Sequence, residues 1–405
     1  MGLGLKYVLE AMMAGGQGST AHTGAVPGST LPVSPVQDDL YPATRLGLAA
    51  EATRRAGLAA LLLTPGPDLR YLIGYDAKQL ERLTCLAVPA AGDPFLVVPR
   101  LEQPAAQASP AGGLGLEILA WDETDDPYAL LAGRLALTGG LPVGLADRMW
   151  AMMVLRLRDA LPGVPQQLAS RVLSGLRIRK SPAEVAALRA AGAAIDRVHE
   201  QVPGWLVPGR TEQEVAADIR AAILTEHAQA DFAIVASGPN AASPHHEPSS
   251  RVRQPGDAVV VDIGGTMPSG YCSDCTRTYT VGTPPAEFAR YYQVLKDAQD
   301  AACAAVRPGT SAEAVDAAAR NPIAAAGYGE HFIHRTGHGI GLETHEDPYI
   351  VSGNELPLAP GMAFSVEPGI YPGPHGARIE DIVVCTEDGA ERLNNVTREL
   401  VAVPA

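Results

Sequence analysis

The stretch DAVVVDIGGTMPSGYCSDCTRTYTVG, residues 257–282, decides the fold of the second half of this chain. An apolar run, AVVV, and a run rich in β-branched threonine flank a segment rich in glycine with a proline, which predicts a β-hairpin. The hairpin places Asp262 and Asp274 on facing strands. A buried apolar strand does not normally contain a carboxylate without a partner. Unless both are solvated turn residues, the two carboxylates lie close together and raise each other's pKa until a cation neutralises them.

The same stretch contains a C-x-x-C pair, Cys272 and Cys275, which suggests a redox or zinc site. No second C-x-x-C or nearby histidine pair completes a zinc set. In a strand, the two thiols would point to opposite faces of the sheet. The chain has five scattered cysteines, an odd number, so we expect no disulfide framework and a reducing, cytoplasmic location.

Two more acids lie among apolar residues near the C-terminus. Glu367 follows MAFSV, and Glu380 lies between ARI and DIVVC. Strand alternation alone would allow either side chain to face solvent. Four embedded acids together make a shared buried site the better interpretation.

The segment HRTGHGIGLETHE, residues 334–346, adds three histidines. His334 and His338 have the spacing of two ligands on one helix face, but the intervening glycines disfavour a helix. THEDP also fails the H-E-x-x-H pattern because position 349 is tyrosine. The glycines instead favour close backbone approach, with the histidines projecting from a loop or strand entry.

One imidazole and four carboxylates form a ligand set of mostly hard oxygen atoms. Such a set favours Mn²⁺, Co²⁺ or Fe²⁺, with Zn²⁺ possible. Because five ligands exceed what one ion needs, the set predicts two divalent ions about 3.5 Å apart. Two such ions acidify a bridging water and polarise a carbonyl, as in an aminopeptidase or a related hydrolase.

Length and charge limit the organisation of the whole chain. With 405 residues, two domains are expected. The net charge of -14 disfavours nucleic acid and anionic membranes as partners, and no apolar run reaches the roughly 18 residues of a membrane-spanning helix. We predict a flexible tail over 1–38, an α/β domain over 39–168 and an α+β domain with antiparallel hairpins over 169–405. Capping-box patterns at Ser181 and Thr211 predict the first two helices of the last domain.

At this point the order of the ligands and their flanking words resembles the pita-bread metallopeptidases, most closely the Xaa-Pro dipeptidases (prolidases) and Xaa-Pro aminopeptidases. The motifs that support the resemblance are DIGG…SDCTRT, GHGIGLETHE, FSVEPGIY and RIED. PDLRYLIGYD is similar to a stretch of the family's creatinase-like N-terminal domain. The resemblance covers roughly residues 40 to 400, and it implies a pita-bread catalytic domain after an α/β domain, and a homodimer.

The resemblance also implies a role for each site residue. Asp274 and Glu380 would bridge the two ions, which we expect to be Mn²⁺, with Co²⁺ or Zn²⁺ as alternatives. Asp262 would complete one metal, and His338 and Glu367 the other. Glu367 would also move a proton towards the leaving proline nitrogen.

The remaining roles concern the substrate. SGPNAASPHHEPSS, residues 237–250, resembles the loop with a substrate histidine, so His245 and His345 would bind the scissile carbonyl and the tetrahedral intermediate. Arg378 would brace the carboxylates, and His334 would form a pocket wall. Tyr371 is a further substrate-binding candidate. His246 stays unassigned.

The family resemblance predicts hydrolysis of the peptide bond before proline in Xaa-Pro dipeptides. The alternative is an aminopeptidase that releases the first residue from longer Xaa-Pro peptides. Some prolidases have an arginine between the equivalents of His345 and Glu367, and this chain has none. The substrate carboxylate would then be held by His245, Tyr371, Arg378 or a group from the partner subunit.

Three other members of the same fold are less consistent with the sequence. A metal-free creatine amidinohydrolase and a peptide- or histone-binding module do not need the ligands, yet all five ligand positions are present here. Methionine aminopeptidase shares the ligands but lacks both the N-terminal domain and the PHHEPS type of loop. A peptidase specific for proline remains the prediction.

Overall fold

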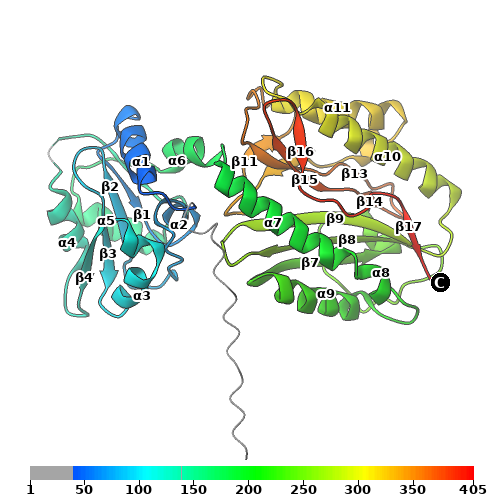
Figure 1. Ribbon diagram of the computed structural model, residues 1–405, viewed down its shortest axis with the longest axis horizontal. Helices are drawn as coiled ribbons and strands as arrows, with labels where there is room; N and C mark the ends of the chain where they lie inside the picture. The colour runs from blue at the N-terminus through cyan, green and yellow to red at the C-terminus, as the bar shows by residue number, and fades with distance from the viewer. Residues whose placement is uncertain (1–39, 138) are drawn as a thin grey trace, which may run out of the picture. The chain divides into compact units, whose positions relative to one another are not determined.

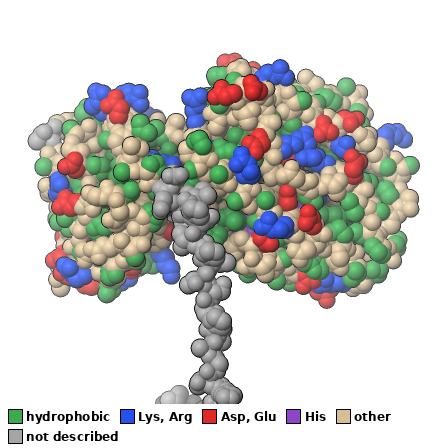
Figure 2. Space-filling view, viewed as in Figure 1, with side chains coloured by type: hydrophobic (Ala, Val, Ile, Leu, Met, Phe, Trp, Pro, Cys, Tyr) green, Lys and Arg blue, Asp and Glu red, His purple; other side chains and the backbone are tan. Residues whose placement is uncertain are grey.

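A computed structural model describes residues 40–137 and 139–405. The predicted flexible tail over 1–38 lies outside the described residues. No described helix is both long enough and apolar enough to cross a membrane. On the face of the molecule shown in Figure 2, basic and acidic side chains are interspersed among hydrophobic ones.

The first part of the chain forms a six-stranded mixed sheet with the strand order β4-β3-β2-β1-β5-β6. Its strands are β1 (Ala60–Leu63), β2 (Cys85–Pro89), β3 (Phe95–Pro99), β4 (Glu117–Trp121), β5 (Val143–Leu145) and β6 (Gln166–Leu168). Its helices are α1 (Thr44–Arg55), α2 (Pro67–Ile73), α3 (Gln103–Ala108), η1 (Pro110–Gly113), α4 (Pro127–Leu135), α5 (Ala151–Ala160) and α6 (Ser170–Arg177). The predicted alternation of helices and strands is confirmed.

Both faces of this sheet are apolar. Leu61 and Leu63 of β1 pack into one core together with α1, α2 and α6. Leu62, between them, packs into a second core with α4 and α5. Because successive side chains of a strand point to opposite faces, an uninterrupted apolar strand requires helices on both sides, as Figure 1 shows.

The next helices begin where their capping boxes predict. The Ser181 hydroxyl accepts from the backbone of Glu184 at the start of α7 (Pro182–His199), and the Glu184 carboxylate accepts in return from Ser181. Thr211 and Glu214 form the same box at α9 (Glu212–Glu226). Before them, α6 packs into the first core. The domain boundary between 168 and 169 stays a prediction.

The second part contains two larger sheets and a small one. A four-stranded sheet has the order β17-β9-β8-β7, a five-stranded sheet has the order β11-β10-β12-β15-β16, and β13 pairs with β14. The strands are β7 (Gln229–Ser237), β8 (Ala258–Thr266), β9 (Cys272–Val281), β10 (Gly337–Gly339), β11 (Glu346–Ile350), β12 (Ala363–Val366), β13 (Gly369–Ile370), β14 (Ala377–Arg378), β15 (Asp381–Cys385), β16 (Ala390–Arg392) and β17 (Val401–Val403). The remaining helices are α8 (Val202–Trp205), η2 (Gly238–Ala242), α10 (Ala286–Ala305), α11 (Ala312–Ala325) and η3 (Gly329–His331).

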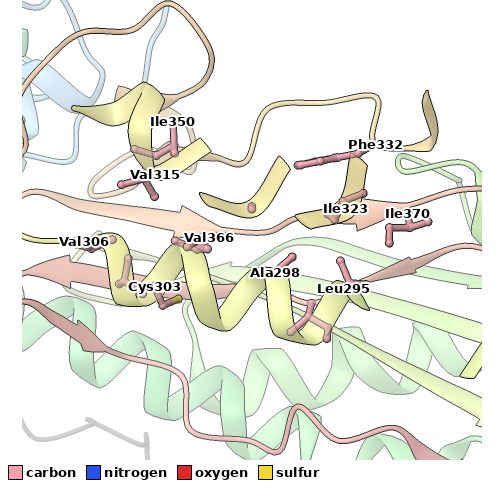
Figure 3. Close-up of a cluster of buried hydrophobic side chains, with 14 of the residues drawn as sticks. Leu295, Ala298, Cys303, Val306, Val315, Ile323, Phe332, Ile350, Val366 and Ile370 are labelled. Atoms are coloured by element: carbon pink, nitrogen blue, oxygen red, sulfur yellow. The ribbon is translucent and has the colours of Figure 1, made fainter. Parts of the chain in front are cut away.

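Each large sheet has helices against one face. Helices α7, α8 and α9 pack on β7, β8 and β9, and α10 and α11 pack on the sheet that contains β12 and β15. Figure 3 shows the second of these cores, where Leu295 and Ala298 of α10 lie near Val366 and Ile370. The predicted α/β domain followed by an α+β pita-bread domain is confirmed.

Candidate metal centre

The hairpin of β8 and β9 is polar on the face that the helices leave uncovered. Val261 and Ile263 of β8 face the core with α7 and α9, so Asp262 between them faces the other way. On β9, Cys275 faces the same core, and Asp274 points away. Asp274 pairs with Gly264, two residues from Asp262, as expected for aspartates on facing strands.

The C-x-x-C pair has no metal-binding geometry. Cys272 lies in a different hydrophobic cluster from Cys275, because the two residues are on opposite faces of β9. Burial raises the pKa of the Cys272 thiol to about 11 and that of the Cys275 thiol well above its ordinary value. Both are buried thiols in the core, as expected for a strand.

Three predicted ligands meet at one point. One ligand atom each from Asp274, His338 and Glu380 lie within 4.8 Å of one another, and all three residues are buried. They come from β9, from β10 and from the turn between β14 and β15. Residues separated by more than a hundred positions in the sequence therefore form one cluster.

Glycines let the histidine strand approach its neighbours. A Cβ on Gly337 would lie 1.8 Å from the carbonyl oxygen of Ser365 on β12. A Cβ on Gly339 would lie 2.2 Å from the carbonyl oxygen of Asp347 on β11. Since neither distance is possible, β10 fits between β11 and β12 only if positions 337 and 339 are glycine. The expected close backbone approach is confirmed.

The His338 ring presents a bare nitrogen to the acids. Its Nδ1 lies 3.2 Å from the carbonyl oxygen of Gly339, so this nitrogen has the proton and donates. Its Nε2 is 3.7 Å from Asp274 Oδ2 and 3.3 Å from Glu367 Oε1. Burial, together with the neighbouring His345, lowers the pKa of His338 to about 3, so the ring is neutral. A lone pair facing carboxylate oxygens calls for a cation between them.

The carboxyl groups of the cluster also face one another. Burial, and then the nearby carboxylates, raise the pKa of Asp274 and of Glu380 well above the ordinary range. Burial raises the pKa of Glu367 to about 7, against the opposing effect of Arg378. Buried acids that repel one another are stable as anions only beside positive charge. This donor set therefore suits divalent metal ions.

Arg378 organises one side of the cluster. Its guanidinium donates to Asp262 Oδ2, to the Thr276 hydroxyl at 3.1 Å and to the Tyr371 hydroxyl at 3.1 Å. The other carboxylate oxygen of Asp262, Oδ1, is buried and has no hydrogen-bond partner among the described residues. An unpaired buried carboxylate oxygen is costly, and a metal ion is the partner that would satisfy it.

A hydrogen-bonded chain continues from Arg378 to His334. The Tyr371 hydroxyl accepts from Arg378 and lies 3.0 Å from His334 Nε2, while His334 Nδ1 lies 2.7 Å from the carbonyl oxygen of Arg335. This pattern assigns the His334 proton to Nδ1. Burial, and then Arg378, lower the pKa of His334 to about 4. His334 is a neutral ring fixed by Tyr371.

Two predicted histidines remain, His345 and His245. The His345 ring centre is 4.1 Å from that of His338, and the side chain is exposed. Partial burial, then the charges of Arg335 and His245, lower the pKa of His345. His245 is exposed and follows η2, in the loop before β8. His345 thus lies beside His338, whereas the position of His245 at the site stays a prediction.

Sequence reasoning missed three residues of this region. The Thr276 hydroxyl donates to Glu380 Oε2 at 2.6 Å, and Ser365 donates to Glu367 Oε1 at 3.1 Å. The guanidinium of Arg335 stacks over Tyr349 at 4.4 Å. The period of two along the strands was the available signal, because Thr276 is two residues after Asp274 and Ser365 is two before Glu367.

Comparisons with known proteins agree with this geometry. The sequence model of the Creatinase/Prolidase N-terminal domain matches residues 45–179, and that of Metallopeptidase family M24 matches residues 186–387. The chain is similar to a probable dipeptidase PepE from Mycobacterium tuberculosis, with 58% identity over 89% of this chain and 96% of the relative. It is 36% identical to a Xaa-Pro dipeptidase from Lactobacillus helveticus, over 83% of this chain and 92% of the relative.

A solved structure shares the whole architecture. The crystal structure of dipeptidase PepE from Mycobacterium ulcerans superposes with a TM-score of 0.85 at 56% identity, and the match covers 91% of this chain and 99% of the other. Both domains are therefore common to the two proteins. The chain belongs to Metallopeptidase family M24, with a creatinase/prolidase N-terminal domain ahead of the peptidase domain.

Proposed function

We propose that this chain hydrolyses the peptide bond before proline in Xaa-Pro dipeptides and uses two divalent metal ions, which we expect to be Mn²⁺. The cluster of Asp274, His338 and Glu380 is the observation on which the proposal depends. The similarity to a protein named Xaa-Pro dipeptidase supports the choice of substrate. The aminopeptidase activity on longer Xaa-Pro peptides is the alternative.

The five predicted ligands suit a pair of ions. Asp274, Glu380 and His338 already share one cluster and would hold the ions together with Glu367 and Asp262, whose Oδ1, unpaired among the described residues, is free for a metal. Two divalent ions supply an acidified water and a polarised carbonyl to the reaction. Co²⁺ and Zn²⁺ are alternatives for the same donor set.

The protein's own groups handle the proton and the developing charge. Glu367 takes the proton of the attacking water and passes it to the proline nitrogen as this secondary amine leaves. His345 and His245 donate hydrogen bonds to the scissile carbonyl oxygen as it becomes an oxyanion. Arg378 keeps Asp262 oriented, and Tyr371 with His334 forms the adjoining wall.

A dipeptide also brings a free carboxylate, which needs a cation. Arg378 and Tyr371, two of the groups considered for this role, already make hydrogen bonds to Asp262, Thr276 and His334. Arg335 makes no side-chain hydrogen bond or ion pair with any described residue, and it stacks on Tyr349, the strand partner of His338. We therefore propose Arg335 as the group that binds the substrate carboxylate.

Three substrates distinguish the dipeptidase from the aminopeptidase. Ala-Pro, Leu-Pro and Ala-Pro-Ala are assayed side by side with added Mn²⁺, and the metal content of the purified protein is measured. We expect rapid cleavage of both dipeptides and little cleavage of the tripeptide. A tripeptide cleaved at a similar rate would favour the aminopeptidase. Absence of bound metal together with no activation by added metal would reject both.

We further propose that the protein is a cytoplasmic homodimer. All five cysteines are free thiols in the core, which suits a reducing compartment. The mass measured by light scattering after gel filtration tests the dimer, with twice the chain mass of 42.2 kDa as the expected value.

A further inference from the structure

Glu212 is a buried acid outside the metal centre that neither the ligand set nor the proposed chemistry uses. It is the first residue of α9, and its side chain is fully buried. No lysine or arginine pairs with it among the described residues. A carboxylate in this setting is stable only if hydrogen bonds replace its water.

The segment from Ser237 to Ser249 supplies the hydrogen bonds that the Glu212 carboxylate accepts. The backbone N–H and the hydroxyl of Ser237 donate to Oε1 at 2.7 and 2.6 Å, and the same groups of Ser249 donate to Oε2 at 3.0 and 2.7 Å. The amide of Asn240 and Nε2 of His246 complete the set, at 3.1 and 2.9 Å. Burial would raise the pKa of Glu212, but these hydrogen bonds outweigh it and lower the pKa to about 2.

The donors lie at both ends of the segment from Ser237 to Ser249, which includes His245. The His245 side chain is exposed and makes no hydrogen bond with the described part of the chain, so the backbone alone sets its position. Next to His245, the carbonyl oxygen of Pro244 accepts from Arg378 at 3.3 Å. The segment is thus held between Glu212 and the arginine of the metal centre.

We propose that Glu212 is a positioning residue that fixes the segment from Ser237 to Ser249 and thereby places His245 against the substrate carbonyl. The inference rests on the proposed peptidase function, since His245 has a catalytic role only there. It also gives His246 a role, because the hydrogen bond from His246 to Glu212 fixes the backbone next to His245.

Glu212→Gln removes the charge and replaces an acceptor oxygen with a donor NH₂ that faces other donors. Hydrogen–deuterium exchange tests the segment without reference to activity. We expect exchange of the amides in 240–250 to become at least about tenfold faster, because hydrogen bonds to a charged group are lost. Glu184→Gln is the matched control, because Glu184 is a buried acid in the capping box of α7, and this variant should leave that segment unchanged. Unchanged exchange in Glu212→Gln would overturn the proposal.

A double-mutant cycle with His245→Ala tests the route to catalysis. Alone, Glu212→Gln should lower kcat for Ala-Pro by about 10- to 100-fold, as a misplaced catalytic group does, with little change in KM. In the His245→Ala background the same substitution should change kcat by less than about twofold, because Glu212 acts on catalysis only by placing His245. An equal loss in both backgrounds would show that Glu212 does not act through His245.

The same measurements separate this proposal from the proposed function. A wild-type protein that holds metal but cleaves no Xaa-Pro substrate would reject the function, and with it the catalytic role of His245. Rapid exchange in the Glu212→Gln variant together with normal kinetics would leave the function intact and reject the positioning role.

Discussion

The first sheet and the β8–β9 hairpin use buried strands in opposite ways. Leu61, Leu62 and Leu63 of β1 are fully buried, and the sheet has apolar contacts on both faces. In the hairpin, one face packs on helices, whereas the other presents Asp262, Asp274 and Thr276. A buried strand that is apolar on both faces contributes stability, and one with acids on a face is destabilised by them until a cation is bound. The comparison predicts that substitutions in the first sheet lower stability without changing activity. Substitutions of the acids at the metal centre should lower activity without lowering the stability of the metal-free protein.

The largest effect is expected for Glu367→Gln. The amide keeps the size of the side chain but has no carboxylate to take and return a proton. We expect kcat for Ala-Pro to fall by about 10³-fold or more. Glu226→Gln, at a surface ion pair with Arg197, is the control and should keep normal turnover. Turnover within tenfold of the wild type in the Glu367 variant would remove this residue from the proton transfer.

Asp274→Asn should lower activity without lowering the stability of the metal-free protein. It removes a ligand, so metal content and turnover should both fall strongly. It also removes one of the mutually repelling acids, so the metal-free variant should melt at or above the temperature of the metal-free wild type. Calorimetry after treatment with a chelator gives the two Tm values. A lower Tm in the metal-free variant would contradict the view that these acids destabilise the apoprotein.

Arg335→Ala tests the rim of the site. Losing a hydrogen-bonded cation should raise KM for Ala-Pro by roughly 10- to 100-fold, with a much smaller change in kcat. Ala-Pro amide has no free carboxylate, so its KM should be nearly the same for the variant and the wild type. Equal loss for the acid and the amide would show that Arg335 does not bind the carboxylate.

The smallest effect on catalysis is expected in the first sheet. Leu62→Ala should cost about 2–5 kcal/mol of unfolding free energy through the cavity it leaves, while kcat per folded molecule stays unchanged. Leu48→Ala, at an exposed position of α1, is the control and should change stability by less than about 0.5 kcal/mol. Urea unfolding combined with activity measurements checks both variants. A large loss of kcat in folded Leu62→Ala would show that packing in the first sheet affects the metal centre, contrary to this prediction.

Local patterns were sufficient for many predictions. The capping boxes at Ser181 and Thr211 begin α7 and α9 as expected, because the side-chain and backbone partners are three residues apart. Glycines between two strand-like runs predicted the β8–β9 hairpin, and the glycines around His338 predicted close backbone approach. Each of these features is decided within one continuous stretch of chain.

Contacts across the fold were not available from the sequence. Thr276 donates to Glu380, 104 positions away, and Glu212 holds Ser249, 37 positions away. Hydroxyl and carboxyl side chains occur on many solvated surfaces, so the residue types alone did not identify these pairs, although the period of two placed Thr276 on the face of Asp274. Arg335 was missed for a similar reason, because its contact with Tyr349, the strand partner of His338, exists only in the folded protein.

By itself, the sequence determined the class of this protein: two domains, a hairpin with two buried aspartates, a glycine-rich histidine strand and two further embedded acids. These follow from periodicity and from the cost of burying charge, which are properties of short segments. Only the tertiary structure decided which nitrogen of His338 is bare, which oxygen of Asp262 lacks a partner and which acid holds the His245 segment. Those outcomes depend on hydrogen bonds between residues that are brought together only after the sheets have packed.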